Sequence, residues 1–213
     1  MPELQFQIEG AEALANAASP QIVFKVRITN SEPQPVHSIA LRVQVQIEPV
    51  RRRYTPQEQE HLKDLFGGPE RWSTSLHPLL WANISINVSG FSGSRVIDVP
   101  VPCTFDFNVA MTKYIYGLEN GELPTSLLFS GSVFYAGAVG LQVAQIPWDR
   151  EAGYRLPVRV WKEMMDAYYP NAGWIALRRD VFERLNDFKS QHGFATWEQT
   201  LERLLGMPAE VKV

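Results

Sequence analysis

Residues 36–47 carry the most constraining pattern in the chain, a strict alternation of apolar and polar side chains. The apolar members are Ile39, Leu41, Val43, Val45 and Ile47. A period of two is typical of a β-strand, and polar residues at the intervening positions indicate that one face of the strand meets water. The segment therefore predicts an antiparallel sheet with one face packed on a core and the other face solvated.

Shorter runs of the same kind lie on both sides of this segment and predict further strands. They cover residues 4–8, 22–28, 79–88, 95–101 and 141–146. Between two of them, Thr55-Pro56-Gln57-Glu58 has the form of a capping box with proline at the first helical position, which predicts a helix over residues 56–66. The sequence before residue 105 is thus mostly β, with one short helix inserted.

Residues 105–130 have the pattern of a helix followed by a strand. Apolar side chains at helical spacing predict a helix over residues 107–119, which ends at Asn120-Gly121. Its apolar face consists of Phe107, Ala110, Met111, Tyr114 and Leu118. The next apolar run, residues 127–135, is too dense for a strand with a solvated face, so it predicts a strand that is buried on both faces or lies at the centre of a sheet.

The chain after residue 147 is predicted to be helical. Amphipathic spacing predicts helices over residues 158–168 and 180–191, and the capping sequence Thr196-Trp197-Glu198-Gln199 begins a third helix.

These elements together predict an α+β fold. We expect one compact domain, residues 1–213, because no flexible linker separates its parts. A β-rich part, residues 1–147, would form an antiparallel sheet or open sandwich with the helix over residues 107–119 crossing it. A helical part, residues 148–213, would follow.

Composition and charge exclude several classes of partner. The formal net charge is −3, so no general basic field attracts nucleic acid or an anionic membrane. No apolar run approaches the roughly 18 residues of a membrane span, and the N-terminus lacks the pattern of a secretory signal, so a cytoplasmic protein is expected. The single cysteine excludes an internal disulfide, and the four scattered histidines form no metal-binding pattern, so neither metal nor cofactor is predicted.

Three features indicate chemistry, and each has a structural alternative. Cys103 precedes the predicted helix, where a thiol can have a lowered pKa, but most lone cysteines are buried as small hydrophobic residues. Asp149 and Glu151 beside Trp148 are a carboxylate pair next to a stacking surface, as in sugar-binding sites, or part of a turn. The basic run Arg51-Arg52-Arg53 is a phosphate contact or a solvated strand end.

The aromatic residues leave a further alternative open. Trp161 and Trp174 are core residues or, where exposed, part of a protein-binding face. A separate hypothesis is an enzyme or small-ligand binder, whose pocket would be lined by Cys103, Tyr114, Trp148 and Asp149.

Several segments resemble those of a bacterial protein family of unknown function, and the match covers nearly the whole chain. They are LRVQVQIEPVRRRYTPQEQ, VPVPCTFDF, LLFSGSVFY and VAQIPWDREAGYRLPVRVWKEMMDAYYPN. Members of that family are often encoded beside nickel–iron hydrogenase genes. The resemblance therefore implies a non-enzymatic accessory protein that binds another protein, in hydrogenase assembly or regulation, and it carries no assigned catalytic residues.

A second pattern is similar to that of the SecB export chaperone: strands, a crossover helix, then Gly121-Glu122-Leu123-Pro124 and Leu127-Leu128. This resemblance implies a four-stranded antiparallel sheet, a homo-oligomer and binding of unfolded clients. Residues 49–78 and 131–213 have no counterpart in that pattern, so fold similarity alone does not establish the function.

Overall fold

The computed structural model describes residues 2–103, 109–138, 140–173 and 175–206. By its internal contacts the chain divides into two compact units, Met1–Ala172 and Gly173–Val213. The first unit extends well past residue 147, where the β-rich part was expected to end, because a further strand and helix belong to it. That the whole chain forms one domain stays a prediction.

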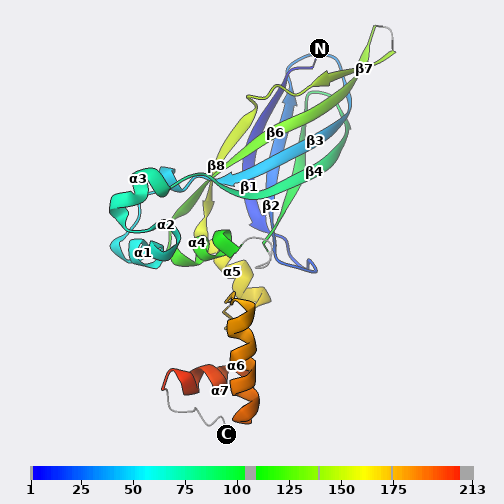
Figure 1. Ribbon diagram of the computed structural model, residues 1–213. Coiled ribbons are helices and arrows are strands. Elements are labelled where there is room, and N and C mark those ends of the chain that lie inside the picture. Colours follow the sequence, from blue (N-terminus) through cyan, green and yellow to red (C-terminus); the bar gives the residue numbers. More distant parts are fainter. Residues whose placement is uncertain (1, 104–108, 139, 174, 207–213) are drawn as a thin grey trace. The chain divides into compact units, whose positions relative to one another are not determined.

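The first unit contains two antiparallel sheets, as Figure 1 shows. The three-stranded sheet has the order β1-β2-β5, with bounds Leu4–Ala13, Gln21–Asn30 and Ser94–Pro102. The five-stranded sheet has the order β4-β3-β6-β7, and β8 also pairs with β6; the bounds are Leu79–Phe91, Val36–Ile47, Glu122–Gly137, Gly140–Gln145 and Glu151–Pro157. The predicted α+β class with antiparallel strands is confirmed. The two-sheet arrangement differs from the single four-stranded sheet that the chaperone resemblance implies.

The two sheets pack face to face through aromatic side chains. Phe6 of β1 stacks on Phe129 of β6 with ring centroids 4.1 Å apart. Phe24 of β2 meets Trp81 of β4 and Tyr154 of β8 edge-on, at 6.3 Å and 6.0 Å. The apolar set of residues 36–47 is buried and the intervening residues are not, which confirms the prediction for that strand. Removing these large side chains from water is the main driving force for joining the sheets.

β6 is the central strand of the larger sheet. One side pairs with β3 along most of its length, and the other side pairs first with β8 and then with β7. Leu123, Leu127 and Phe129 are fully buried, and Thr125 and Ser126 are buried between them. Over residues 127–135, however, buried side chains alternate with exposed or half-exposed ones. The expectation of a strand buried on both faces is therefore wrong for that range, whereas its alternative, a strand at the centre of the sheet, is confirmed.

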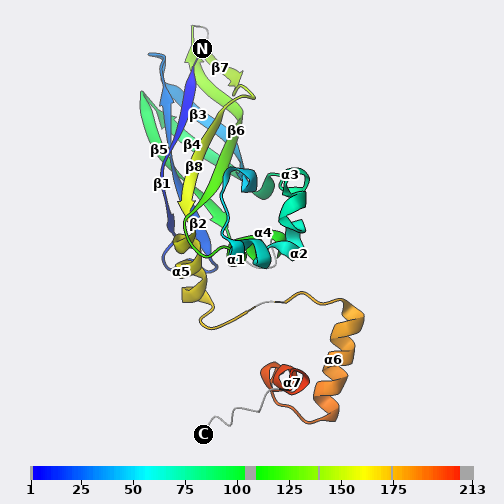
Figure 2. The same cartoon turned by 90° about the vertical axis from the view of Figure 1, so that its left-hand side faces the viewer.

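The shorter helices lie together beside one end of the sandwich, as Figure 2 shows. Their bounds are Pro56–His61 for α1, Lys63–Phe66 for α2, Trp72–Ser75 for α3 and Val109–Gly117 for α4, with 3₁₀ turns at Pro49–Arg51 and Pro69–Arg71. The capping box is present, because Thr55 accepts from the amide of Glu58 and Glu58 accepts from the amide of Thr55. The predicted single helix is divided at Leu62, and residues 107–108 of the predicted crossover helix lie outside the described residues.

β8 corrects the expectation that everything after residue 147 is helical. Residues 151–157 pair with Glu122–Leu128 of β6. Their alternation was hard to recognise because Ala152 and Gly153 are small, so the inward and outward positions differ little in hydrophobicity. The expected helix after it is α5, Val158–Tyr168, which buries Trp161, Met164 and Met165.

The second unit is a helix pair, α6 (Arg179–Gln191) and α7 (Trp197–Leu204). Phe182 meets Trp197 at 5.5 Å between ring centroids, and the ammonium of Lys189 lies over the Trp197 ring at 5.6 Å. The predicted capping sequence is confirmed, because Thr196 and Gln199 form a capping box. Thr200 is the one fully buried side chain among the described residues of this unit.

Candidate functional site

The outer face of the three-stranded sheet is charged. Lys25 of β2 lies between Asp98 of β5, at 2.9 Å, and Glu12 of β1, at 3.2 Å. Arg27 pairs with Glu9 at 2.5 Å. These are exposed cross-strand pairs that keep this face solvated, so each contributes little to stability.

The outer face of the five-stranded sheet has a different composition. We call the part of it formed by β3, β4, β6 and β7 the neutral face, and its side chains are exposed or half-exposed. It consists of Ser38, Ala40, Arg42 and Gln44 of β3, Asn83, Ser85, Asn87 and Ser89 of β4, Ser130, Ser132, Phe134 and Ala136 of β6, and Leu141, Val143 and Gln145 of β7. Of these side chains only Arg42 is charged. β8, on the other side of β6, adds the exposed charges of Glu151 and Arg155 to the same outer surface, beyond the neutral face.

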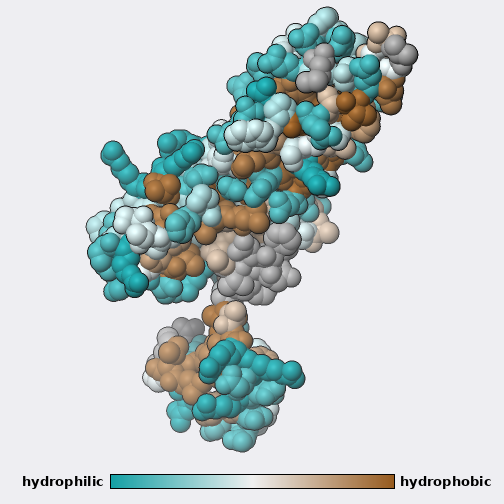
Figure 3. All heavy atoms as spheres, turned by 45° about the horizontal axis from the view of Figure 1, so that its top comes forward, coloured by the Kyte–Doolittle hydropathy of each residue, from teal (hydrophilic) through white to brown (hydrophobic). Residues whose placement is uncertain are grey.

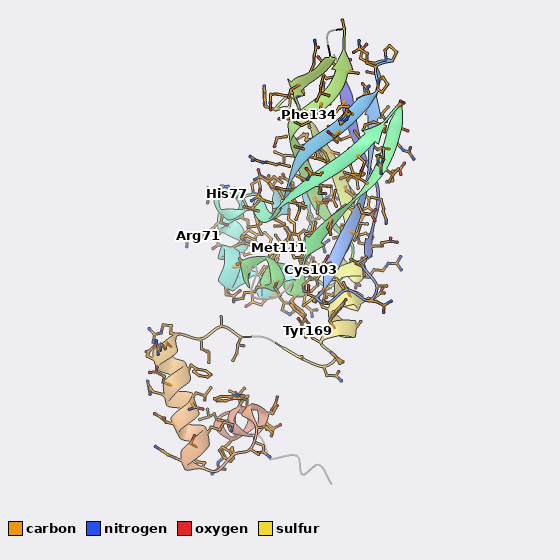
Figure 4. All side chains as sticks on the ribbon, turned by 90° about the vertical axis from the view of Figure 1, so that its right-hand side faces the viewer. Arg71, His77, Cys103, Met111, Phe134 and Tyr169 are labelled. Atoms are coloured by element: carbon orange, nitrogen blue, oxygen red, sulfur yellow. The ribbon has the colours of Figure 1, made fainter. Side chains whose placement is uncertain are left out.

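The end of the neutral face at the β6–β7 hairpin is apolar. The register places Phe134 opposite Val143 and Ala136 opposite Leu141. Leu141 is 61% exposed and Val143 is 54% exposed. Figure 3 shows hydrophobic atoms at this end of the sheet, and Figure 4 shows Phe134 at the end remote from Cys103.

One depression is set into the neutral face, and another lies beside its apolar end. The one beside the apolar end, of about 440 Å³, is lined by Pro35, Val36, His37, Gly90, Phe91, Ser92 and Ala136. The other, of about 220 Å³, lies between β3 and β4 beside Arg42, Ser85 and Asn87. A flat surface with shallow hollows, few charges and many short hydrogen-bonding side chains suits contact with another protein.

Sequence reasoning missed this face because it searched for single chemistry-bearing residues. A usable signal was present: the polar positions of residues 38–44 and 83–89 are Ser, Asn and Gln, with one arginine. Ordinary solvated strand faces carry more Lys and Glu, as the charged face of this chain does.

Cys103 and Tyr114, two residues of the predicted pocket, are buried in the core. Cys103 follows β5, is 4% exposed and donates from Sγ to the carbonyl oxygen of Val101 at 3.4 Å. Burial raises the pKa of the Cys103 thiol to about 12. Tyr114 of α4 is fully buried, with its hydroxyl 2.8 Å from that of Tyr54, and burial raises its pKa far above the ordinary value.

The remaining predicted site residues lie elsewhere. Trp148 is 92% exposed in the turn between β7 and β8, and Asp149 beside it is also exposed. Trp161 is buried in α5 and meets Tyr116 edge-on at 4.9 Å, as a core residue does. Trp174 lies outside the described residues.

The predicted pocket is therefore wrong. It was expected to be lined by Cys103, Tyr114, Trp148 and Asp149, but the first two are enclosed by the core and the last two project from a turn. None of the four lines either depression or the groove beside α5.

The groove beside α5 has a volume of about 590 Å³ and lies in the first unit, between the β1–β2 connection and α5. Its walls are small and apolar: Ala11, Ala13, Ala15, Ala17, Val160, Met164 and Ala167. Of the polar residues of its lining, Glu12, Asn16 and Glu163 are exposed to solvent, and the half-buried Tyr168 already donates its hydroxyl hydrogen bond to the carbonyl oxygen of Ala17 at 2.7 Å. The groove thus offers apolar surface without buried polar groups that could orient a ligand.

The basic run is solvated at Arg51 and Arg53, as one of its two alternatives expects, but not at Arg52. Arg52 is a buried cation, with 8% of its side chain exposed, and its Nη2 lies 2.5 Å from Oε1 of Glu58, which is 2% exposed. It also donates to the carbonyl oxygens of Asn120, at 2.5 Å, and Glu122, at 2.6 Å. Arg51 and Arg53 are exposed.

Glu58 is held ionised by its partners. Burial by itself would raise its pKa, but amide hydrogen bonds from Thr55 and Glu119, together with Arg52, hold the pKa of this carboxyl below its ordinary value. The carboxylate accepts at 3.0 Å from Thr55 and at 2.9 Å from Glu119. This is a structural network that joins the inserted helices to the segment between α4 and β6.

Among the described residues no group of three or more histidine, cysteine or acidic side chains is placed to hold a metal ion. No helix of this part of the chain has the length and apolar composition needed to cross a bilayer.

A family model described as a family of unknown function, DUF6084, matches residues 1–212. The chain belongs to this family. The match confirms the sequence resemblance to a family of unknown function. No curated protein matches this member of DUF6084 in sequence.

Solved structures give only distant likenesses to this DUF6084 chain. The CARDB domain of a protein from Pyrococcus furiosus, solved in complex with di-metal ions, is 11% identical, with a TM-score of 0.29 over 73% of this chain and 92% of that one. A late embryogenesis abundant protein is 12% identical, with a TM-score of 0.36 over 74% and 73%. A protein from Archaeoglobus fulgidus is 10% identical, with a TM-score of 0.30 over 73% and 97%. Likenesses at these scores carry no argument about the site.

Cys103 is expected to be unreactive in the folded protein. Because the thiolate is the reactive form and burial raises the thiol pKa to about 12, iodoacetamide at pH 8 should modify Cys103 only as fast as the protein unfolds. Mass spectrometry of the native and denatured protein measures this. A variant with a second cysteine at the exposed position Ser130 is the control, and it should gain one label rapidly. Rapid native labelling of Cys103 would contradict the buried position.

Proposed function

We propose that this protein is a protein-binding module that docks a folded partner protein on the neutral face. The observation that supports it is a contrast on the surface of one sandwich: the neutral face, formed by β3, β4, β6 and β7, has one charge and an exposed apolar end, whereas the outer face of the three-stranded sheet carries three cross-strand ion pairs. The centre of a protein interface is depleted of charged residues, because each charge must lose its water there.

A protein fits this face better than a nucleic acid does. Arg42 is the one cation among its side chains, and binding to nucleic acid depends on several cations that neutralise phosphates. Serine, asparagine and glutamine can hydrogen-bond to either backbone or side-chain groups of a partner. Phe134, Leu141 and Val143 would supply the apolar contact at one end.

A finer proposal is an accessory role in the assembly or regulation of nickel–iron hydrogenase. It is supported by the sequence resemblance alone, and it makes hydrogenase subunits and their maturation proteins the first candidates for the partner.

Two lysines at the apolar end are expected to abolish most of the binding. In a Leu141→Lys/Val143→Lys variant, two charges would have to be desolvated in the interface, so the affinity for the partner should fall at least about tenfold, or about 1.4 kcal/mol. The partner is first identified by cross-linking in the native host, and binding of the purified pair is then measured by calorimetry.

Val96→Lys is the matched control, because Val96 is 40% exposed and lies on the three-stranded sheet. It should leave the affinity within about twofold, since it makes the same chemical change outside the neutral face. Equal losses from both changes, or full binding by the double variant, would refute a docking role for the neutral face.

A further inference from the structure

The free edge of β4 is unusual among the strand edges of this chain. β4 pairs with β3 on one side, and no described strand pairs with its other side. Its residues, Leu79–Phe91, include no charged residue and no proline. Natural proteins usually protect a long exposed edge with lysine, proline or a covering element, because its unpaired amides and carbonyls can pair with another chain.

The other edges of the sandwich are protected or short. β5, at the edge of the three-stranded sheet, carries Asp98, Pro100 and Pro102, and proline cannot donate a ladder hydrogen bond. β1 lies alongside β8. β7 has only six residues. β4 has contacts with β5, to which a short turn joins it. It is nevertheless the one long edge strand of the described residues that has neither a charged residue nor a proline.

The middle of β4 has a palindromic sequence. Asn83-Ile84-Ser85-Ile86-Asn87 reads the same in both directions. In an antiparallel pair of two copies centred on Ser85, residue 83 lies opposite residue 87 of the second copy and residue 84 lies opposite residue 86. Every cross-strand pair is then a pair of like residues: asparagine with asparagine, isoleucine with isoleucine, serine with serine.

Each of these pairs is chemically favourable. An asparagine amide carries both donor and acceptor groups, so two asparagines can bond each other on the neutral face. Ile84 and Ile86 point toward the core side and are only half-buried in a single copy, so a second strand would cover them. No like charges meet, because the strand has none.

We propose that two copies of this chain pair through β4, antiparallel and centred on Ser85, so that two five-stranded sheets become one continuous sheet. The two-fold axis passes between the two Ser85 residues, and the interface is the same surface on both copies. The proposal does not depend on the docking role of the neutral face, because it rests on the edge of the sheet and not on its apolar end.

The first test is the mass of the wild-type protein in solution. Light scattering after size exclusion should give twice the monomer mass of 24.2 kDa. Ser85→Lys should give a monomer, because two ammonium groups would face each other across the axis. An equimolar mixture of Ser85→Lys and Ser85→Glu should form dimers again, since opposite charges then meet. Ser130→Lys, the same change on β6 away from the edge, should stay dimeric.

A second test determines the pairing register of the two β4 strands by disulfide cross-linking. Directly opposed residues of an antiparallel pair have Cα atoms about 4.5–5.5 Å apart, within the range of a disulfide. Ser85→Cys should therefore cross-link to its own copy under mild oxidation, and the buried Cys103 should not interfere. Asn83→Cys should not cross-link to itself. In this register residue 83 lies opposite residue 87 of the second copy, so the two residues 83 are about 13 Å apart, four residues along the strand. A mixture of Asn83→Cys and Asn87→Cys should cross-link.

A monomeric wild-type protein at all concentrations would overturn the proposal. So would a dimer that survives Ser85→Lys or fails to cross-link through Ser85→Cys. If the wild-type protein is a monomer that binds a different protein, and Ser85→Lys abolishes that binding, the dimer proposal is wrong and the edge of β4 pairs with a strand of the other protein. Loss of partner binding in the Leu141→Lys/Val143→Lys variant with the dimer intact would separate the two proposals.

Discussion

Arg52→Ala is expected to lower the free energy of unfolding by roughly 3–5 kcal/mol, because it leaves the buried carboxylate of Glu58 without its cation. It also removes the donors that meet the carbonyl oxygens of Asn120 and Glu122. Urea denaturation followed by circular dichroism measures the change.

Arg51→Ala is the matched control, because it truncates the neighbouring arginine at an exposed position. We expect that variant to lie within about 0.5 kcal/mol of the wild type. Equal stability of the Arg52 and Arg51 variants would show that the buried network contributes little.

The effect of Arg52→Ala should also depend on pH in a defined direction. The pKa of Glu58 is held below its ordinary value of 4.5 in the folded protein. The stabilising contribution of Glu58 is therefore present above that value and is lost as the pH falls through the lowered pKa of the native state. The difference between wild type and variant should be largest near neutral pH and should shrink in acid.

Gly131→Ala is expected to cost roughly 2–6 kcal/mol, the sum of a strained backbone and an overpacked contact. Gly131 has φ +135°, a conformation that L side chains rarely adopt, and a Cβ there would overlap the carbonyl oxygen of Ala40 in β3. Because β3 and β6 are the inner strands of the larger sheet, the overlap cannot be relieved at an edge. Chemical denaturation again gives the free energy of unfolding.

Gly153→Ala in β8 is the comparison for this change. A Cβ at Gly153 would meet only the carbonyl oxygen of Thr125 at 3.9 Å, an ordinary contact. We expect that substitution to change stability by less than about 1 kcal/mol in either direction. If Gly131→Ala were as mild, the close approach of β3 and β6 would have to be wrong.

Local patterns predicted the individual strands and helices well and their assembly poorly. The alternation of residues 36–47 gave β3 with its observed bounds, and both capping boxes are present. The sequence did not decide between one sheet and two, because the pairing of β2 with β5 joins segments far apart in the chain. β8 was missed because a small alanine and a glycine weaken its alternation.

The candidate site shows why residue type alone is a poor guide to function. Cys103 and Tyr114 look chemically interesting, yet both are buried in the core. Arg52 was expected to be solvated or to contact phosphate, and it is buried against Glu58. Burial depends on which strands and helices meet, and periodicity reports only the face of one element at a time.

The hydrogen bonds of Arg52 reach residues 68 and 70 positions further along the chain. They connect the helices inserted between β3 and β4 to the first residue of β6, the central strand of the larger sheet, and to the segment just before it. Local unfolding of the inserted helices would therefore break hydrogen bonds to the sheet as well. The insertion and the sheet should unfold as a single cooperative unit, whose limits follow this network and not the order of the elements along the chain.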